Sequence, residues 1–231
     1  MNPGQDSKIK TENISILRDL ADSMKLVLTS RYFYIGVVVL AFGMLLNFAS
    51  QTYLHNYMSE GKTLPMLSDL ILDNIPYMNV GFYYDIGSLL SVFVALTYIV
   101  VKKQGRQFSY FLILMGIFYV VRGIFIVLTP FGNPPLFNGS GAPFNGFSRY
   151  ELGVYPSGHV GNAVMFFLLA RDRFFKWLLF AVVIFIIITL LLARGHYSVD
   201  IFSGWFFAYA IKSFGEKHLR YFDLSEDPAP L

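Results

Sequence analysis

The chain has 231 residues, of which 55% are hydrophobic, 14% are charged and none is cysteine, and its net charge is +3. A soluble domain carries about 25% charged residues. The composition therefore excludes a disordered chain, a basic nucleic-acid-binding protein and a disulfide-stapled secreted domain. One helical crossing of a bilayer takes about 20 apolar residues. The apolar half of the chain supplies five or six crossings, and we expect an all-α integral membrane protein.

Residues 1–31 are polar and basic, and they lack the short apolar core of a signal peptide. Apolar residues nevertheless recur at helical spacing in this segment. That spacing predicts an amphipathic cytoplasmic segment lying at the membrane surface, with a frayed polar tail as the alternative. The apolar positions are Ile14, Leu17, Leu20, Met24 and Leu28.

Six apolar stretches follow, and each predicts a transmembrane helix. Together they make residues 32–212 a six-helix membrane domain, with residues 213–231 as a tail. The stretches lie near residues 32–54, 84–101, 108–129, 157–170, 174–193 and 197–211.

The basic residues are distributed unevenly about these six stretches. Because basic loops remain in the cytoplasm, the distribution predicts that both termini are cytoplasmic. Loops 55–83 and 130–156 then face the outside of the cell or an organelle lumen. Fourteen of the 18 Lys and Arg residues fall on the predicted cytoplasmic side: Lys8, Lys10, Arg18, Lys25, Arg31, Lys102, Lys103, Arg106, Arg171, Arg173, Lys176, Lys212, Lys217 and Arg220.

The fourth apolar stretch opens with Ser157, Gly158 and His159. Ser157 is a plausible helix N-cap, and Gly158 lets a ligand approach the backbone closely. The free N–H groups at a helix N-terminus favour anions such as phosphate. We therefore interpret His159 as lying beside a phosphate-binding helix start, with an interfacial histidine on a helix cap as the alternative.

The last apolar stretch opens with a second histidine. His196 and Asp200 are four residues apart, so they share one face of a helix. A carboxylate bonded to one imidazole nitrogen fixes the tautomer and raises the basicity of the other nitrogen. The pair is therefore typical of a nucleophilic or general-base histidine, and a local pair that seals a helix end is the alternative.

Chain order brings the two histidines together. One full crossing separates their helices, so both helices begin on the same side of the membrane. Stretches of about 14 or 15 residues reach only about 22 Å, which is less than a hydrocarbon core of about 30 Å. We therefore expect both histidines to be recessed. Arg122, within the third stretch, falls at the same depth and suits a phosphate, with a structural pairing to Asp85 or Asp200 as the alternative.

These residues resemble a known family of membrane enzymes. Pro156-Ser157-Gly158-His159, followed by His196 and Asp200, is similar to the motifs of the type 2 phosphatidic acid phosphatase superfamily. The closer resemblance is to its sphingomyelin-synthase-like branch, in which the last motif reads His-Tyr-(Ser/Thr)-x-Asp. Two weaker likenesses are Arg122-Gly123-Ile124 with Leu128-Thr129-Pro130, and Leu67-Ser68-Asp69 with Asp73. The resemblance covers roughly residues 60–212.

The sequence also departs from the family patterns. Leu190 stands where the soluble-type signature has an Arg six residues before the nucleophilic histidine. Gly153 stands where the synthase branch has an acidic residue, with Glu151 two residues earlier. A phosphate-binding cation must therefore come from elsewhere, and the candidates are Arg122, Arg194 and Arg149.

The resemblance implies a phosphoester mechanism that needs no cofactor. His196, oriented by Asp200, would attack phosphorus, and His159 would protonate the leaving oxygen. Arg122, Ser157 and Gly158 would hold the phosphate. Attack of water on the phospho-histidine would make the protein a lipid phosphatase, whereas attack of a lipid alcohol would make it a headgroup phosphotransferase.

Two other functional classes remain as alternatives at this point. A lipid transporter or scaffold of the same fold would also bury charges in its helices. Two histidines and an aspartate could ligate a metal ion, although an anion-binding helix start favours phosphate over metal. The composition gives no reason to expect a nucleic-acid partner.

Overall fold

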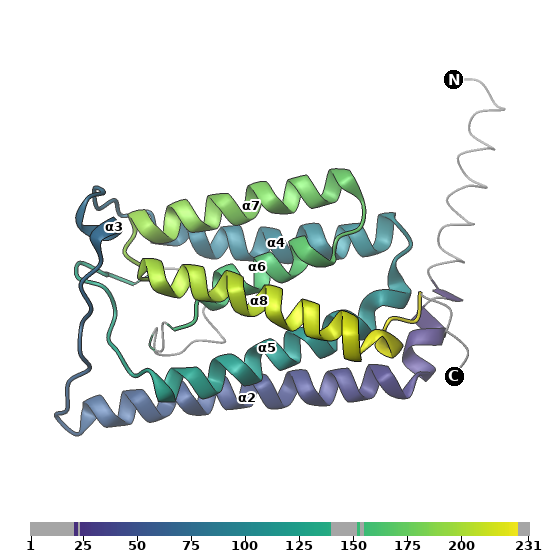
Figure 1. The fold of residues 1–231 in the computed structure, drawn as a ribbon, viewed down its shortest axis with the longest axis horizontal. Coiled ribbons are helices and arrows are strands. Elements are labelled where there is room, and N and C mark those ends of the chain that lie inside the picture. Colours follow the sequence, from purple (N-terminus) through teal and green to yellow (C-terminus); the bar gives the residue numbers. More distant parts are fainter. Residues whose placement is uncertain (1–20, 23, 140–151, 153–154, 226–231) are drawn as a thin grey trace, which may run out of the picture.

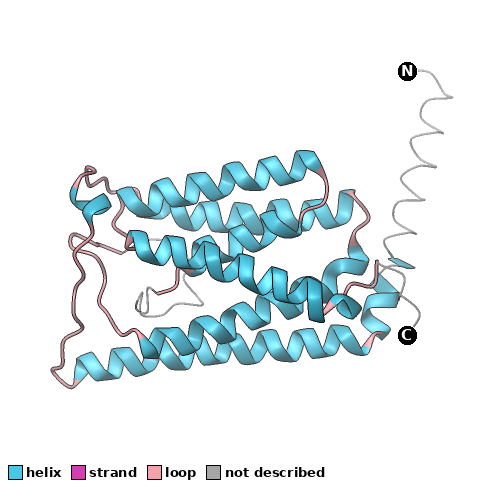
Figure 2. Cartoon of the chain, in the orientation of Figure 1, coloured by secondary structure: helices cyan, strands magenta, loops and turns pink. Residues whose placement is uncertain are grey.

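The computed structural model describes residues 21–22, 24–139, 152 and 155–225, and within this part of the chain the regular structure is helical (Figure 2). The predicted all-α class is confirmed for these residues. Of the predicted N-terminal helix, residues 21–22 and 24–29 are helical and residues 1–20 lie outside the described part. The elements are α2 (Arg31–Ser59), α3 (Leu70–Asp73), α4 (Gly81–Val101), η1 (Gly105–Gln107), α5 (Phe108–Leu128), α6 (Gly158–Leu169), α7 (Arg173–Leu192), α8 (Ser198–His218) and η2 (Arg220–Phe222).

Four of the described segments are long and apolar enough to cross a membrane: Arg31–Ser59, Gly81–Val101, Gly105–Leu128 and Arg173–Leu192. The apolar helix α6 is shorter, with 12 residues. Helix α8 has 21 residues but is less apolar. An integral membrane protein is therefore consistent with the structure, while the number of six crossings remains a prediction.

Helix α8 is longer than the sequence predicted. The apolar stretch was expected to end at residue 211, yet the helix continues to His218. Lys212 and Glu216 lie one turn apart and form an ion pair of 2.6 Å, so these charges support the helix. At 1.5 Å per residue α8 is about 31 Å long. The sequence predicts that the helices now labelled α6 and α8 are both too short to cross the hydrocarbon core. This prediction is wrong for the length of α8 and holds for α6, which is about 18 Å long.

The helices pack as pairs around α6 (Figure 1). Helices α2 and α5 lie side by side, α4 packs against α7, and α8 packs against α6. Helix α6 also contacts α4, α5 and α7, which makes it the central helix of the bundle. The start of α6 is therefore surrounded by other helices.

Glycines allow α2 and α5 to approach closely. A Cβ atom on Gly43 would lie 2.7 Å from the carbonyl oxygen of Gly116, and one on Gly116 would lie 2.6 Å from the backbone nitrogen of Leu40. Membrane helices use such small residues because only close backbone contact gives strong van der Waals packing in lipid. This contact fixes α5, the helix that carries Arg122.

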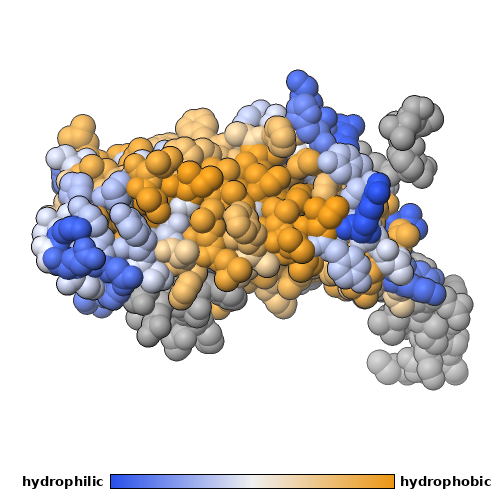
Figure 3. Space-filling model, turned by 90° about the horizontal axis from the view of Figure 1, so that it is seen from below, coloured by the Kyte–Doolittle hydropathy of each residue, from blue (hydrophilic) through white to orange (hydrophobic). Residues whose placement is uncertain are grey.

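The two ends of the bundle differ in chemistry. We call the end at which α6 and α8 begin the histidine end, and the end at which α4 and α8 finish and α7 begins the basic end. Lys102 follows α4, Arg173 begins α7 and Lys217 lies in the last turn of α8. Figure 3 shows one face of the molecule, on which hydrophobic residues cover the middle and hydrophilic residues gather toward both ends.

Candidate active site

The start of α6 is tied to the start of α8. Ser157 is the N-cap of α6, and its hydroxyl accepts a hydrogen bond of 3.3 Å from the backbone N–H of Val160. The backbone N–H of Ser157 donates to the carbonyl oxygen of Asp200 over 3.0 Å. Ser157 is fully buried. Its side chain therefore builds the helix start, and the two histidine-bearing segments are held against each other.

His196 and Asp200 form a buried pair at the start of α8. Nδ1 of His196 lies 3.3 Å from Oδ2 of Asp200, and the same oxygen accepts a hydrogen bond of 2.9 Å from the backbone N–H of Tyr197. The i, i+4 spacing in the sequence predicted this pairing. Since the carboxylate engages Nδ1, the Nε2 atom of His196 is the nitrogen available to a substrate.

His159 lies beside His196, as the chain order led us to expect. Their ring centroids are 5.8 Å apart and the rings are nearly perpendicular. Nε2 of His159 lies 3.0 Å from Oδ1 of Asp85 in α4. The histidine is the more exposed partner, with 30% of its side chain accessible against 13% for Asp85.

Asp85 was not identified from the sequence as the partner of a histidine. The only available signal was that it is the one acidic residue in α4, and an acid in a membrane helix points to a functional site. His159 and His196 therefore each have their own carboxylate: Asp200 contacts His196 at the start of α8, and Asp85 contacts His159 between two helices.

Arg122 is buried in α5 directly beside the start of α6. Its Nε donates to the carbonyl oxygen of Pro156 over 3.0 Å, and its Nη1 donates to Oδ1 of Asn47 in α2. A Cβ atom on Gly158 would lie 3.0 Å from Nε of Arg122. Gly158 therefore makes room for the guanidinium, and Asn47 is a second residue of this region that sequence reasoning missed.

The structure places Arg194 differently from Arg122. Its backbone has a φ of 56°, and its Nη2 donates to the carbonyl oxygen of Ile75 over 2.9 Å. Its buried Nε has no hydrogen-bond partner among the described residues. Arg194 thus anchors loop 55–83 through Ile75. The other candidate cation, Arg149, and the acidic candidate Glu151 lie outside the described residues.

Two contacts hold loop 55–83 on the histidine end. Asp69 caps α3 by accepting from the N–H groups of Ile71 and Leu72, and its Oδ2 accepts from the backbone N–H and the hydroxyl of Ser198 over 2.6 and 2.8 Å. The hydroxyl of Tyr197 accepts from the N–H of Leu67 over 3.1 Å. Hydrogen bonds from this loop therefore hold the start of α8 in place.

The same tyrosine also contacts loop 130–156. The Tyr197 hydroxyl donates to the carbonyl oxygen of Asn133 over 3.2 Å, and the N–H of Gly132 donates to the carbonyl oxygen of Pro65 over 2.9 Å. Tyr197 is fully buried. The described parts of both loops therefore meet over the residue that follows His196.

Electrostatics favour the ionised form of Asp69. Burial is the largest single influence and by itself raises the pKa, but the hydrogen bonds from Ser198, Leu72 and Ile71 together hold the pKa of Asp69 below its ordinary value. The carboxylate is therefore charged at neutral pH. That charge strengthens its contacts to the start of α8.

Comparison with known families supports phosphoester chemistry. The model of the family described as PAP2 superfamily C-terminal matches residues 156–216. This range contains His159, His196 and Asp200 and runs from the residue before Ser157 to the last turn of α8. The match supports the type 2 phosphatidic acid phosphatase superfamily, whose members hydrolyse or transfer phosphoesters. No curated protein matches the chain.

We expect Asp69→Asn to destabilise the protein at neutral pH by about 1–3 kcal/mol, because the charged hydrogen bonds to Ser198 weaken. The folded pKa of Asp69 is lowered, so its stabilising contribution is full above the unfolded pKa and is lost as the pH falls through the folded pKa. Thermal unfolding in detergent should therefore show a difference between wild type and variant that shrinks on acidification.

The matched control for this experiment is Asp73→Asn. Asp73 lies in the same short helix but is exposed, so its loss should leave the unfolding temperature nearly unchanged. Equal effects of the two substitutions at neutral pH would contradict the role of Asp69.

Proposed function

We propose that the protein is a membrane-embedded lipid phosphate esterase that works through a phospho-histidine intermediate. The observation that supports this most strongly is the pair of histidines whose rings are 5.8 Å apart, each with its own carboxylate. Two imidazoles at this separation can act on one phosphorus atom from opposite sides, one on the attacking side and one on the leaving side.

In the first step the Nε2 lone pair of His196 attacks phosphorus, and the bond between phosphorus and the ester oxygen breaks. His159 gives a proton to the leaving lipid oxygen. Because Asp85 engages Nε2 of His159, Nδ1 is the nitrogen from which this proton is delivered. Asp200 holds the His196 ring in orientation and compensates the positive charge that the ring acquires.

In the second step a water molecule attacks the phospho-histidine. His159 now accepts the proton from that water, the bond between phosphorus and Nε2 of His196 breaks, and phosphate leaves. In both steps Arg122 and the free N–H groups at the start of α6 stabilise the charge on the phosphoryl oxygens. Arg194 is a further candidate for holding the phosphate, through the Nε that makes no hydrogen bond among the described residues.

The alternative acceptor in the second step is a lipid alcohol. The protein would then be a headgroup phosphotransferase of the sphingomyelin-synthase type, as the His196-Tyr197-Ser198-Val199-Asp200 run suggests. The first step and the residue roles are the same in both reactions, so the reaction products distinguish them.

We also propose that the histidine end faces the outside of the cell or an organelle lumen. The basic end gathers Lys and Arg residues at the finish of α4, the start of α7 and the last turn of α8. Such residues remain on the cytoplasmic side of membranes, which supports an outside location for the opposite end.

Purified protein in detergent should release free phosphate from phosphatidic acid, or form a new phospholipid from a phospholipid and ceramide or diacylglycerol. We expect His196→Ala to lower turnover by at least about 1,000-fold, because the nucleophile is lost. His159→Ala should also lower turnover without unfolding the protein. His218→Ala, at the basic end, is the control and should retain activity.

The two products decide between phosphatase and phosphotransferase. Formation of neither product, or full turnover by His196→Ala, would overturn the catalytic proposal and favour a transporter or scaffold.

Asp85 is proposed as a positioning residue for His159. Asp85→Asn should lower kcat for a lipid phosphate by about 10- to 100-fold with little change in KM, since the carboxylate orients the proton donor. The same variant should be much less impaired on p-nitrophenyl phosphate, whose nitrophenolate leaves without a proton. Asp172→Asn, at the start of α7, serves as the control.

A purely structural role for Asp85 predicts something different. Both substrates would then lose activity to the same degree, and that result would remove Asp85 from the mechanism.

The proposed orientation can be tested by single-cysteine labelling, because the chain has no cysteine of its own. Ser68 and Lys217 are exposed residues at the histidine end and the basic end, respectively. In intact cells or sealed vesicles of known orientation, Ser68→Cys should react with a membrane-impermeant thiol reagent from outside, and Lys217→Cys should react only after permeabilisation. The reverse pattern would invert the proposed topology.

A further inference from the structure

A second polar site lies at the basic end, away from the histidines. A cavity of about 300 Å³ lies between the end of α6, the start of α7, the end of α8 and η2. Four cationic side chains line it: Arg171, Lys176, Lys212 and Arg220. Its volume is at the lower limit of small-molecule sites, which span about 300–1,000 Å³.

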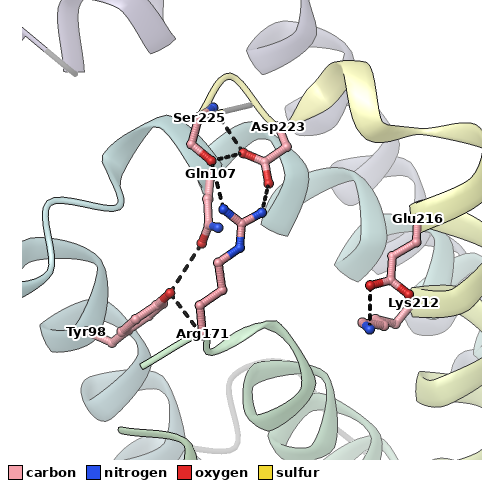
Figure 4. A network of polar contacts seen from close by, with 7 residues as sticks. All are labelled: Tyr98, Gln107, Arg171, Lys212, Glu216, Asp223 and Ser225. Atoms are coloured by element: carbon pink, nitrogen blue, oxygen red, sulfur yellow. Dashed lines mark hydrogen bonds and ion pairs between the residues drawn. The ribbon is translucent and has the colours of Figure 1, made fainter. Parts of the chain in front are cut away.

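Two carboxylates in this cavity hold two of the four cations in place. Figure 4 shows Arg171 beside Asp223 and Ser225, with Lys212 and Glu216 paired on the yellow helix α8. The Arg171–Asp223 ion pair measures 2.7 Å, and the Lys212–Glu216 pair measures 2.6 Å. Asp223 is nearly fully buried, so Arg171 is fixed by a rigid partner.

Basic residues outnumber acidic ones among the described residues that line the cavity. Four cationic side chains and two carboxylates belong to this described lining. These cations come from α7, α8, η2 and the segment between α6 and α7, so the fold brings them together. Like charges held close together repel one another, and an anion with several oxygens would relieve that repulsion.

Part of the remaining wall of the cavity is apolar, and Gln107 adds a polar amide to it. Tyr110, Leu168 and Leu169 line it beside the cations, and these residues belong to helices α5 and α6, which extend into the apolar middle of the bundle. A free inorganic ion would gain nothing from the two leucines. A lipid would place its phosphate among the cations and its first methylene groups against the leucines.

We propose that this cavity binds the phosphate group of an anionic lipid headgroup in the leaflet opposite the histidine end. The site shares no residue with the proposed active site, so it does not depend on the proposed reaction. It would anchor the ends of α6 and α8, whose starts carry the two histidines.

The test measures lipid binding to the purified full-length protein in neutral detergent by native mass spectrometry. The probes are phosphatidylglycerol, phosphatidylcholine and inorganic phosphate. The variant is Lys176→Gln with Lys212→Gln, and the matched control is Arg173→Gln with Lys217→Gln. The control removes the same charge from the same end at exposed residues that do not line the cavity.

We expect wild-type protein to bind phosphatidylglycerol at least about tenfold more tightly than phosphatidylcholine, since a basic residue near anionic lipid contributes roughly fivefold in affinity. The Lys176→Gln and Lys212→Gln variant should lose about tenfold or more in phosphatidylglycerol affinity. The control variant should lose less than about threefold. Lipid bound at the histidine end contributes equally to both variants and cancels in the comparison.

Lys176→Gln alone keeps both ion pairs and guards against misfolding of the double variant. It should weaken phosphatidylglycerol binding by about fivefold while preserving the unfolding temperature. Equal losses of phosphatidylglycerol affinity in the double variant and in the control would overturn the proposed site. Equal binding of phosphatidylglycerol and phosphatidylcholine by wild-type protein would do the same. Binding of inorganic phosphate as tight as that of phosphatidylglycerol would overturn its assignment to a lipid.

Discussion

A guanidinium buried in an apolar bundle must find partners for its N–H groups, and the histidine end is organised around that requirement for Arg122. Its partners are Asn47 from α2 and the carbonyl oxygen of Pro156. Arg122 thereby fixes the entry of α6, and a Cβ atom at position 158 would lie tightly against its guanidinium. The residue after Pro156 is Ser157, and its backbone N–H is hydrogen-bonded to the backbone of α8. One buried cation therefore helps to position both histidines.

The same requirement explains why each histidine has a carboxylate. An acidic side chain in the bundle is costly unless it is hydrogen-bonded, and Asp200 meets this cost with the backbone of Tyr197 and the ring of His196. Oδ1 of Asp85 meets it through His159. The second oxygens, Oδ2 of Asp85 and Oδ1 of Asp200, are buried and have no hydrogen-bond partner among the described residues. The contacts that stabilise these acids also fix which imidazole nitrogen is left for a substrate, so stability and the proposed chemistry arise from the same bonds.

Prediction from the sequence succeeded for local contacts and, through chain order, for the proximity of His159 and His196, but it missed specific side-chain pairs between helices. Apolar runs located every long helix, and the i, i+4 spacing of His196 and Asp200 located that pair. The contacts of His159 with Asp85 and of Arg122 with Asn47 join residues 74 and 75 positions apart. No periodicity in the sequence relates such residues. The only sequence signal for them is that they are polar residues within apolar stretches. The end of α8 was misjudged because charge was taken to end the helix.

The shortness of α6 links the two ends of the molecule. Its 12 residues span about 18 Å, whereas the hydrocarbon core of a bilayer is about 30 Å thick. His159 lies in its first turn and Leu169, which lines the basic cavity, is its last residue. In the proposed orientation, at least one of the two polar sites therefore reaches below the level of the headgroups. A central helix that does not span the core explains how a chain with so few charges can place them at lipid depth.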